Sequence, residues 1–333
     1  MNNYLIIGLG SMGKRRVNCL LSLGIKANCI FGMDKREDRC EEAKQKYGIN
    51  TVSDELEIDF SQIKAVIVSL PPDKHILGVK LALKHEKPVF VEASVVLEDV
   101  QKICEYNTKN IFVAPSCTFV YHPMIKEIKK IVASQKLGKI CNFSYHSGQY
   151  LPDWHPWEDI KDFYVSNRLT GGAREIVAYE LTWMTEIFGF PMDIKGYFRK
   201  TSSLDCNIED SYVSVIDYGD MVGTLIVDVV GRYAVRNLVI NFERGQIQWR
   251  WDKAQLEVYD AETEEWTFIS QPEQLHVNGY NENIGENMYI EEVDSFIKGI
   301  EDASLFSNTV EKDIKVLKLL EKLEESDGGF DRK

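Results

Sequence analysis

The chain has 333 residues, and its formal net charge of −13, from 52 acidic and 39 basic residues, argues against a nucleic-acid or anionic-membrane surface. The length allows two domains with separate cores, and 44% hydrophobic and 27% charged residues are ordinary for a soluble globular protein. No apolar run approaches the roughly 20 residues of a membrane span, and the first predicted strand leaves no room for a signal peptide. The seven scattered cysteines form no C-x-x-C pair and suit a reducing compartment, so we expect a cytoplasmic protein.

The first residues that point to chemistry form a glycine-rich loop. Residues 4–7 are a short apolar run of buried-strand type, and G-x-G-x-x-G follows and opens a helical pattern. The first glycine permits a tight turn, the second lets a pyrophosphate approach the backbone, and the third lets the helix pack closely on the strand. The free N–H groups of the helix N-terminus then face the phosphates. The predicted loop contacts to a dinucleotide are Gly8, Leu9, Gly10, Ser11, Met12 and Gly13.

An acidic residue about 20 positions after the loop predicts which dinucleotide binds. Asp34 follows the second apolar run, residues 27–31, where its carboxylate should accept hydrogen bonds from the adenosine ribose and repel a 2′-phosphate. This favours NAD. Lys35 and Arg36 come next in the chain, and either could turn to meet that phosphate, so NADP stays open as the alternative cofactor.

The two halves of the chain have different hydrophobic patterns. Up to about residue 118, short apolar runs alternate with helical patterns, which predicts βαβ units in a doubly wound parallel sheet. From residue 140 onward, long alternating runs separated by turns predict a large, open, mostly antiparallel sheet, interrupted by a helix over 176–188. We therefore predict an α/β chain with a Rossmann domain over residues 1–118 and an α+β substrate and oligomerisation domain over 119–333.

Two expectations follow for the second domain. Its closing helices, within residues 289–323, should pack back toward the first domain. An open antiparallel face must be solvated or covered, and this predicts a homo-oligomer, a dimer or tetramer, that associates through the sheet.

The motifs together resemble the Gfo/Idh/MocA family of NAD(P)-dependent oxidoreductases, which includes glucose–fructose oxidoreductase and inositol dehydrogenase. The resemblance covers nearly the whole chain and rests on G-L-G-S-M-G-K-R-R at 8–16, L-P-P-D-K-H at 70–75 and L-G-K-I at 137–140. The family's corresponding T-P-P-x-x-H lies along the nicotinamide half of the cofactor. The resemblance therefore implies cofactor contacts from Leu70, Pro71, Pro72 and His75, and hydride transfer to or from a sugar, phosphosugar or nucleotide-sugar hydroxyl or ketone.

Two departures from the family pattern mark an atypical branch. The family carries Glu-Lys-Pro after its fifth strand, and its lysine reaches the reacting hydroxyl. After the strand at 89–91 this chain has Glu92 and then Ala93, so both are expected beside the cofactor but the lysine is missing. The family's middle helix has Gly-Gly, then Asp, then His four residues later; here Ile176 and Glu180 stand at the last two positions.

These departures leave two other functions open. The chain could hold NAD without turnover and serve as a sensor or an assembly partner. It could also recycle bound NAD within one turnover, as in an epimerase-like or lyase-like reaction.

Hydride transfer from an alcohol needs a group that takes the hydroxyl proton. Glu180 is the main candidate, because it lies on the apolar face of its helix, where burial would raise the pKa of a carboxyl. The alternative is a structural carboxylate paired with an arginine. Glu175 is a second candidate, although its place in the first turn also suits a simple interaction with the helix dipole.

A tryptophan-rich segment near residue 155 is the other unusual stretch. Trp154 and Trp157 resemble a carbohydrate-binding surface, and His155 between them is a third acid–base candidate. The alternative is a loop pinned to the sheet by its tryptophans. Arg174 could bind a phosphate or carboxylate of the substrate, or form an ordinary ion pair. No His, Cys or carboxylate cluster has metal-ligand spacing, so we expect no metal.

Overall fold

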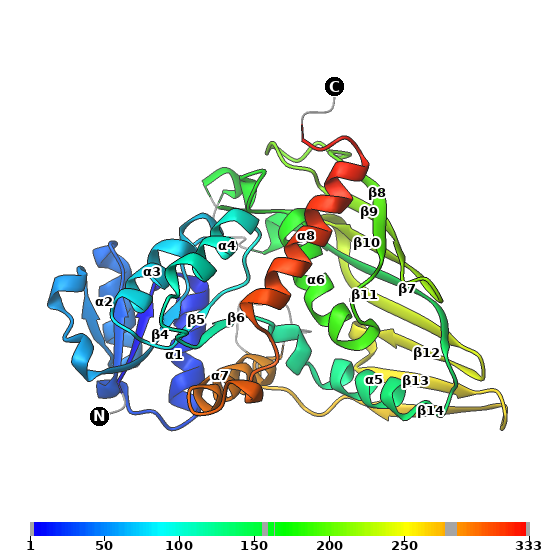
Figure 1. Ribbon diagram of the computed structural model, residues 1–333, viewed down its shortest axis with the longest axis horizontal. Coiled ribbons are helices and arrows are strands. Elements are labelled where there is room, and N and C mark those ends of the chain that lie inside the picture. The colour runs from blue at the N-terminus through cyan, green and yellow to red at the C-terminus, as the bar shows by residue number, and fades with distance from the viewer. Residues whose placement is uncertain (1–2, 155–158, 163, 277–284, 331–333) are drawn as a thin grey trace. The chain divides into compact units, whose positions relative to one another are not determined.

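The computed structural model describes residues 3–154, 159–162, 164–276 and 285–330, and the chain divides into two compact units (Figure 1). The first unit comprises Met1–Thr118 and Asn287–Ile314, and the second comprises Phe119–Glu286 and Lys315–Lys333. The last helix, α8 (Val310–Ser326), contributes residues to both units.

The first unit is built on a six-stranded sheet in the order β3-β2-β1-β4-β5-β6, and all of its strand pairs are parallel. The strands are β1 (Asn3–Ile7), β2 (Ile30–Met33), β3 (Asn50–Val52), β4 (Ile63–Val68), β5 (Val89–Val91) and β6 (Val113–Pro115). The order reverses between β1 and β4, the point at which doubly wound sheets bind ligands at the carboxyl ends of their strands. The predicted parallel sheet is confirmed, whereas β3, with the sequence Asn-Thr-Val, leaves no apolar run in the sequence.

Helices connect these strands and cover the sheet. They are α1 (Ser11–Ser22), α2 (Glu37–Tyr47), α3 (His75–Lys84), α4 (Leu97–Tyr106) and α7 (Asn287–Gly299). Within this unit α7 packs against α1, far from it in the sequence. The central strands β1 and β4 are almost entirely buried, because parallel strands with helices on both faces have no solvated side.

The second unit is built on an eight-stranded sheet in the order β14-β13-β12-β11-β7-β10-β9-β8. Its strands are β7 (Ile140–Tyr150), β8 (Asp193–Arg199), β9 (Ser211–Asp217), β10 (Val222–Asp228), β11 (Val230–Phe242), β12 (Gly245–Arg250), β13 (Gln255–Asp260) and β14 (Glu265–Ser270). Only the pair β7 and β10 is parallel among the pairs in this described sheet, so the predicted mostly antiparallel sheet is confirmed.

One face of the second sheet is covered and the other is open. Helices α5 (Pro123–Ser134) and α6 (Ala173–Phe188) lie on the same side of it as the C-terminal part of α8 (Figure 1). Buried and exposed residues alternate along β9, where the outward-facing Val213 and Val215 are 46% and 53% exposed. Such alternation is typical of an antiparallel sheet with one face toward the core.

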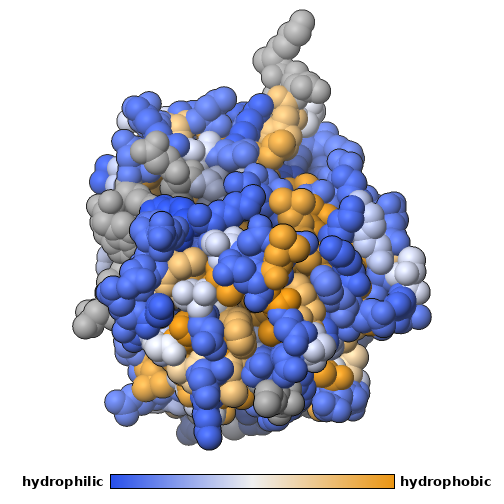
Figure 2. All heavy atoms as spheres, turned by 90° about the vertical axis from the view of Figure 1, so that its left-hand side faces the viewer, coloured by the Kyte–Doolittle hydropathy of each residue, from blue (hydrophilic) through white to orange (hydrophobic). Residues whose placement is uncertain are grey.

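The surface is largely polar. Hydrophilic residues predominate on the face that Figure 2 shows and surround a smaller apolar area near its centre. No helix in the described ranges is both long and apolar enough to cross a membrane.

Candidate cofactor and active site

The glycine-rich loop joins β1 to α1 and admits no side chain at two of its glycines. Gly8 has a φ of +94°, and a Cβ at this position would lie 2.6 Å from the carbonyl oxygen of Ser69. A Cβ at Gly13 would lie 1.8 Å from the carbonyl oxygen of Gly8. The loop is thus held tightly against the ends of β1 and β4. Gly10 is the N-cap of α1 and offers no side chain to the helix, and the first turn has no acidic residue. The backbone N–H groups at this N-terminus are therefore suited to bind phosphate.

Asp34 lies beside this loop, as the sequence predicts for a ribose-binding carboxylate. Its Oδ2 accepts a hydrogen bond of 2.8 Å from the backbone N–H of Leu9, and its Oδ1 accepts one of 2.9 Å from that of Arg36. Arg39, which sequence reasoning missed, has its Nη1 at 3.5 Å from Asp34 Oδ2. The Arg36 guanidinium pairs with Asp38 at 2.5 Å. Each arginine therefore already faces a carboxylate, and a 2′-phosphate would have to compete for it.

The expected nicotinamide end of the site lies at the carboxyl ends of β4 and β5. Leu70, Pro71 and Pro72 lead into a 3₁₀ turn (Pro72–Lys74), and His75 begins α3. The buried ring of His75 contacts the carbonyl oxygen of Leu70 through Nε2 at 2.8 Å, and burial lowers its pKa. A neutral ring that donates from Nε2 holds this turn in place. Its buried Nδ1 has no partner among the described residues.

Glu180, in the second unit, is fully hydrogen-bonded at both of its oxygens. It is completely buried and accepts hydrogen bonds from the Tyr145 hydroxyl (2.8 Å), the Ser147 hydroxyl (2.9 Å), the Trp183 indole (2.6 Å) and Arg236 Nε (3.0 Å). Each of its two oxygens receives two of these donors, which leaves little capacity to accept a proton from a substrate. The geometry favours the alternative of a structural carboxylate paired with an arginine.

Glu175, one and a half turns earlier on α6, has the opposite environment. Its Oε1 accepts a hydrogen bond of 2.9 Å from the Tyr164 hydroxyl, whereas its buried Oε2 has no partner in the described part of the chain. Burial raises the pKa of this carboxyl from 4.5 to about 7, and the hydrogen bond from Tyr164 opposes that shift only in part. A carboxyl with this pKa and a free oxygen can accept and return a proton near neutral pH.

The structure assigns Arg174 to the fold instead of to a substrate. Its Nε and Nη2 donate to the two oxygens of Glu324 at 2.7 and 3.2 Å, and its Nη1 donates to the carbonyl oxygen of Leu169 at 2.7 Å. The Tyr212 hydroxyl also donates to Glu324, at 3.0 Å. The side chain of Arg174 is only 8% exposed, and it forms a buried ion pair between α6 and α8, as in the alternative of an ion pair.

The tryptophan-rich segment is only partly described. The indole N–H of Trp154 is buried and finds no acceptor in the described ranges, so it could donate to a ligand. His155 and Trp157 lie outside the described residues. No group of three or more His, Cys, Asp or Glu side chains in the described part of the chain could hold a metal ion.

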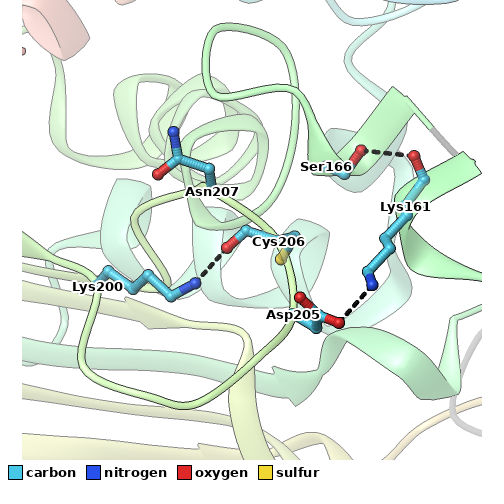
Figure 3. Close-up of a pocket in the computed structure, with 6 residues that line it drawn as sticks. All are labelled: Lys161, Ser166, Lys200, Asp205, Cys206 and Asn207. Atoms are coloured by element: carbon cyan, nitrogen blue, oxygen red, sulfur yellow. Dashed lines mark hydrogen bonds and ion pairs between the residues drawn. The ribbon is translucent and has the colours of Figure 1, made fainter.

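A hollow in the second unit, drawn in Figure 3, offers no comparable site. Lys161 pairs with Asp205, and the Lys200 ammonium donates to the carbonyl oxygens of Leu204, at 2.7 Å, and Cys206. Its lining polar groups thus bond mainly to one another. We place no ligand in this hollow.

A family model matches the N-terminal part of the first unit. Residues 2–112 match the GFO_IDH_MocA model, described as an oxidoreductase family with an NAD-binding Rossmann fold. No curated protein matches the sequence. The chain is similar to the crystal structure of an oxidoreductase from Agrobacterium radiobacter in complex with NAD⁺, L-tartaric acid and magnesium, with 13% identity, a TM-score of 0.83, and coverage of 98% of this chain and 96% of the other.

Two further solved structures show the same fold. An oxidoreductase domain protein from Kribbella flavida has 19% identity and a TM-score of 0.82, with 98% of each chain covered. Levoglucosan dehydrogenase in complex with NADH and levoglucosan has 15% identity and a TM-score of 0.81, with 98% of this chain and 97% of the other covered. Residues 2–112 are thus similar to an oxidoreductase family with an NAD-binding Rossmann fold, and the solved structures share the fold of nearly the whole chain.

Proposed function

We propose that the chain transfers a hydride between NAD and a hydroxyl or ketone of a small carbohydrate-type molecule: a sugar, a phosphosugar or a nucleotide sugar. The match of residues 2–112 to the oxidoreductase family model supports the reaction class. The fold shared with levoglucosan dehydrogenase, whose structure contains NADH and levoglucosan, supports the substrate class. Glu175 carries the proposal within this chain, because it combines an unpartnered buried oxygen with a pKa of about 7.

The residues of the first unit fit NAD. The glycine loop and the N-terminus of α1 would hold the pyrophosphate through their backbone N–H groups. Gly8 and Gly13 fit this role, since a side chain at either position would collide with the backbone. Asp34 would bind the adenosine ribose, and the turns at 70–75 and 92–93 would line the nicotinamide half. When bound, NAD supplies the acceptor or donor of the hydride.

We assign proton transfer to Glu175. Its Oε2 would take the hydroxyl proton as an alcohol becomes a carbonyl and return it in the opposite direction. The Tyr164 hydroxyl orients the carboxylate by donating to Oε1 at 2.9 Å. The buried indole N–H of Trp154 is a donor for a substrate oxygen. Glu180 and Arg236 then support α6 from the sheet side without touching the substrate.

The test is Glu175→Gln, followed by NADH formation with a panel of sugars, phosphosugars and nucleotide sugars. We expect kcat to fall by about 10²–10⁴, the usual effect of losing a general base. NAD affinity should not change, since Glu175 lies outside the Rossmann unit. The matched control is Glu98→Gln, which alters an exposed glutamate in the first turn of α4 and should leave kcat unchanged.

A stability measurement tests the raised pKa on which this role depends. The folded-state pKa of Glu175 lies above the ordinary 4.5, so its stabilising contribution is present below about pH 4.5 and is lost as the pH rises through about 7. The shift from 4.5 to about 7 corresponds to about 3 kcal/mol, at about 1.4 kcal/mol per pKa unit. Relative to the wild type, Glu175→Gln should therefore be more stable at pH 8 than at pH 5. Normal turnover in this variant would contradict the proposal.

One observation favours a second function. Ala93 stands where the family has its lysine, and the carboxylate at the family's histidine position, Glu180, is fully hydrogen-bonded. These features fit a protein that holds NAD as a sensor or assembly partner. Binding of NAD with no turnover of any compound in the panel would support this second function over the first.

We also propose a homo-oligomer that associates through the open face of the second sheet. Apolar side chains stand on this face: Tyr197, Val213, Val215 and Val222 are 66%, 46%, 53% and 46% exposed. Burial of such a patch between two copies would remove apolar surface from water.

A further inference from the structure

A buried cluster of one arginine and two glutamates lies in the first unit, beneath the expected nicotinamide end of the cofactor site. Arg16 comes from α1, Glu92 directly follows β5, and Glu292 comes from α7. The side chains of Arg16 and Glu292 are completely buried, and that of Glu92 is 12% exposed. Neither Arg16 nor Glu292 belongs to the glycine loop or to the proposed proton-transfer group.

Arg16 forms a bidentate ion pair with Glu92. Its Nε and Nη2 each donate to one oxygen of Glu92 at 2.7 Å, and the Ser69 hydroxyl at the end of β4 donates to the same carboxylate at 3.1 Å. The backbone N–H of Glu92 donates to the carbonyl oxygen of Val68 at 3.1 Å. The side chain of Glu92 is therefore fixed in orientation as well as in position, since a planar guanidinium matches a carboxylate in only a few arrangements.

Arg16 also reaches the segment by which the chain leaves the first unit. Its Nη1 donates to Glu292 Oε2 at 2.8 Å. Glu292 in turn accepts hydrogen bonds from the Ser116 hydroxyl (2.9 Å), the Cys117 backbone N–H (2.6 Å) and the Thr118 hydroxyl (2.7 Å). Through its two glutamate partners, the Arg16 guanidinium is thus linked by hydrogen bonds to the residues that follow β4, β5 and β6.

The location of these groups is what connects the cluster to the cofactor. The carboxyl ends of parallel strands form the edge at which doubly wound sheets bind a dinucleotide. The turn that begins at Glu92 continues through Ala93 to Ser94, and the nicotinamide ring is expected against it. A buried ion pair need not add to stability, because apolar groups of the same volume often stabilise as well, so the place of this pair at the binding edge is the observation that points to a role in binding.

We propose that Arg16 is a positioning residue for the nicotinamide half of NAD. By fixing the Glu92 carboxylate, it sets the turn of residues 92–94 against the ring, and through Glu292 it joins this turn to residues 116–118. The inference rests on the NAD site and is independent of Glu175 and of the substrate class.

The test compares two ligands that differ in the nicotinamide ring. NAD and ADP-ribose share the adenosine and the pyrophosphate, so the glycine loop and Asp34 bind both. Arg16→Lys keeps the positive charge but cannot form the bidentate contact with Glu92. We expect the affinity for NAD to fall on the order of tenfold and that for ADP-ribose to stay within about twofold, both measured by calorimetry. The fluorescence of bound NADH, which reports on the surroundings of the reduced ring, should also change.

The matched control is Arg174→Lys, which loosens a buried arginine–glutamate pair in the second unit. It should lower the melting temperature without changing the NAD to ADP-ribose affinity ratio or the NADH emission. The proposal is overturned if Arg16→Lys melts earlier while both readouts keep their wild-type values. It is overturned too if both ligands weaken equally, because the effect would then lie in α1 and the phosphate loop.

A second variant covers the case in which Arg16→Lys does not fold. Glu92→Gln leaves the contact between Arg16 and Glu292 intact and changes the one partly exposed member of the cluster. It should reproduce the selective loss of NAD affinity. Normal NAD affinity and NADH emission in this variant would refute the positioning role. None of these binding measurements depends on turnover. They can therefore refute the role of Arg16 without affecting the proposed function, and loss of the proposed function would leave the role of Arg16 intact.

Discussion

The substitution Glu180→Gln distinguishes a structural carboxylate from a catalytic one. An amide replaces one of the two oxygens with a nitrogen that can only donate. The Tyr145 and Ser147 hydroxyls can rotate and accept from this nitrogen, but the Trp183 indole and the Arg236 guanidinium cannot. If the nitrogen takes the Oε2 position, the indole loses its acceptor; if it takes the Oε1 position, Arg236 Nε does.

Either orientation leaves Arg236 buried without a compensating negative charge. Arg236 has an 8% exposed side chain and stacks on the rings of Phe119 and Trp251, at 4.8 and 4.5 Å from their centroids. Removing one partner of such a buried pair typically destabilises by about 3–5 kcal/mol. In a unit of this size that loss lowers the melting temperature by roughly 10 °C. We therefore expect an early-melting variant that turns over normally while it is folded.

A double variant sharpens the assay. In Glu180→Gln/Arg236→Met the amide nitrogen can face Ser147, and its oxygen can accept from both Tyr145 and Trp183, so no described donor of the cluster is stranded. The double variant should melt later than Glu180→Gln alone, as measured by thermal and urea unfolding. A single variant with a normal melting temperature and a kcat reduced by about 10²–10⁴ would refute the structural assignment.

Two further predictions concern the cofactor and the assembly. NADP should bind at least about tenfold more weakly than NAD in fluorescence titrations. Asp34→Ser should reduce this difference in affinity, because it removes the charge that repels a 2′-phosphate. Tighter binding of NADP to the wild type would contradict this. Val215→Lys, on the open sheet face, should convert the oligomer to a monomer in analytical ultracentrifugation, because it buries an unpaired charge at the contact. An unchanged mass would exclude that face.

The fold was predictable because its signals are local. The glycine spacing, the short apolar runs and the helical patterns between them each occupy a few consecutive residues, and they predict the doubly wound sheet directly. The parallel pairing of β7 with β10 has no such signal. The two strands are more than 70 residues apart in sequence, as the pairing of Asn142 with Val222 shows, and alternation looks the same in parallel and antiparallel neighbours when one face is exposed.

The glycine loop and the Asp34 position beside it were predictable for the same reason, but the partners of buried charges were not. The position of Glu180 on an apolar helix face correctly indicates burial. Its partner Arg236 is 56 residues further on, in the middle of a strand, and no spacing rule connects the two. The contact of Arg39 with Asp34 was not predicted, because Arg39 lies on a surface helix beside other charged residues. Arg16 could have been found, since it shares the buried face of α1 with Leu20, four residues later.

Glu175 and Glu180 show why burial alone does not identify a catalytic carboxylate. Both lie on α6, five residues apart, and both have side-chain oxygens withdrawn from solvent. Glu180 receives four donors, two on each of its oxygens. Glu175 accepts a hydrogen bond from the Tyr164 hydroxyl on Oε1 and none on Oε2 within the described chain, and burial raises its pKa to about 7. A general base must give up its proton as readily as it accepts one, which requires that charged and neutral forms lie close in free energy. The number of donors per carboxylate therefore distinguishes the two glutamates, and it is the reason we propose Glu175 for proton transfer.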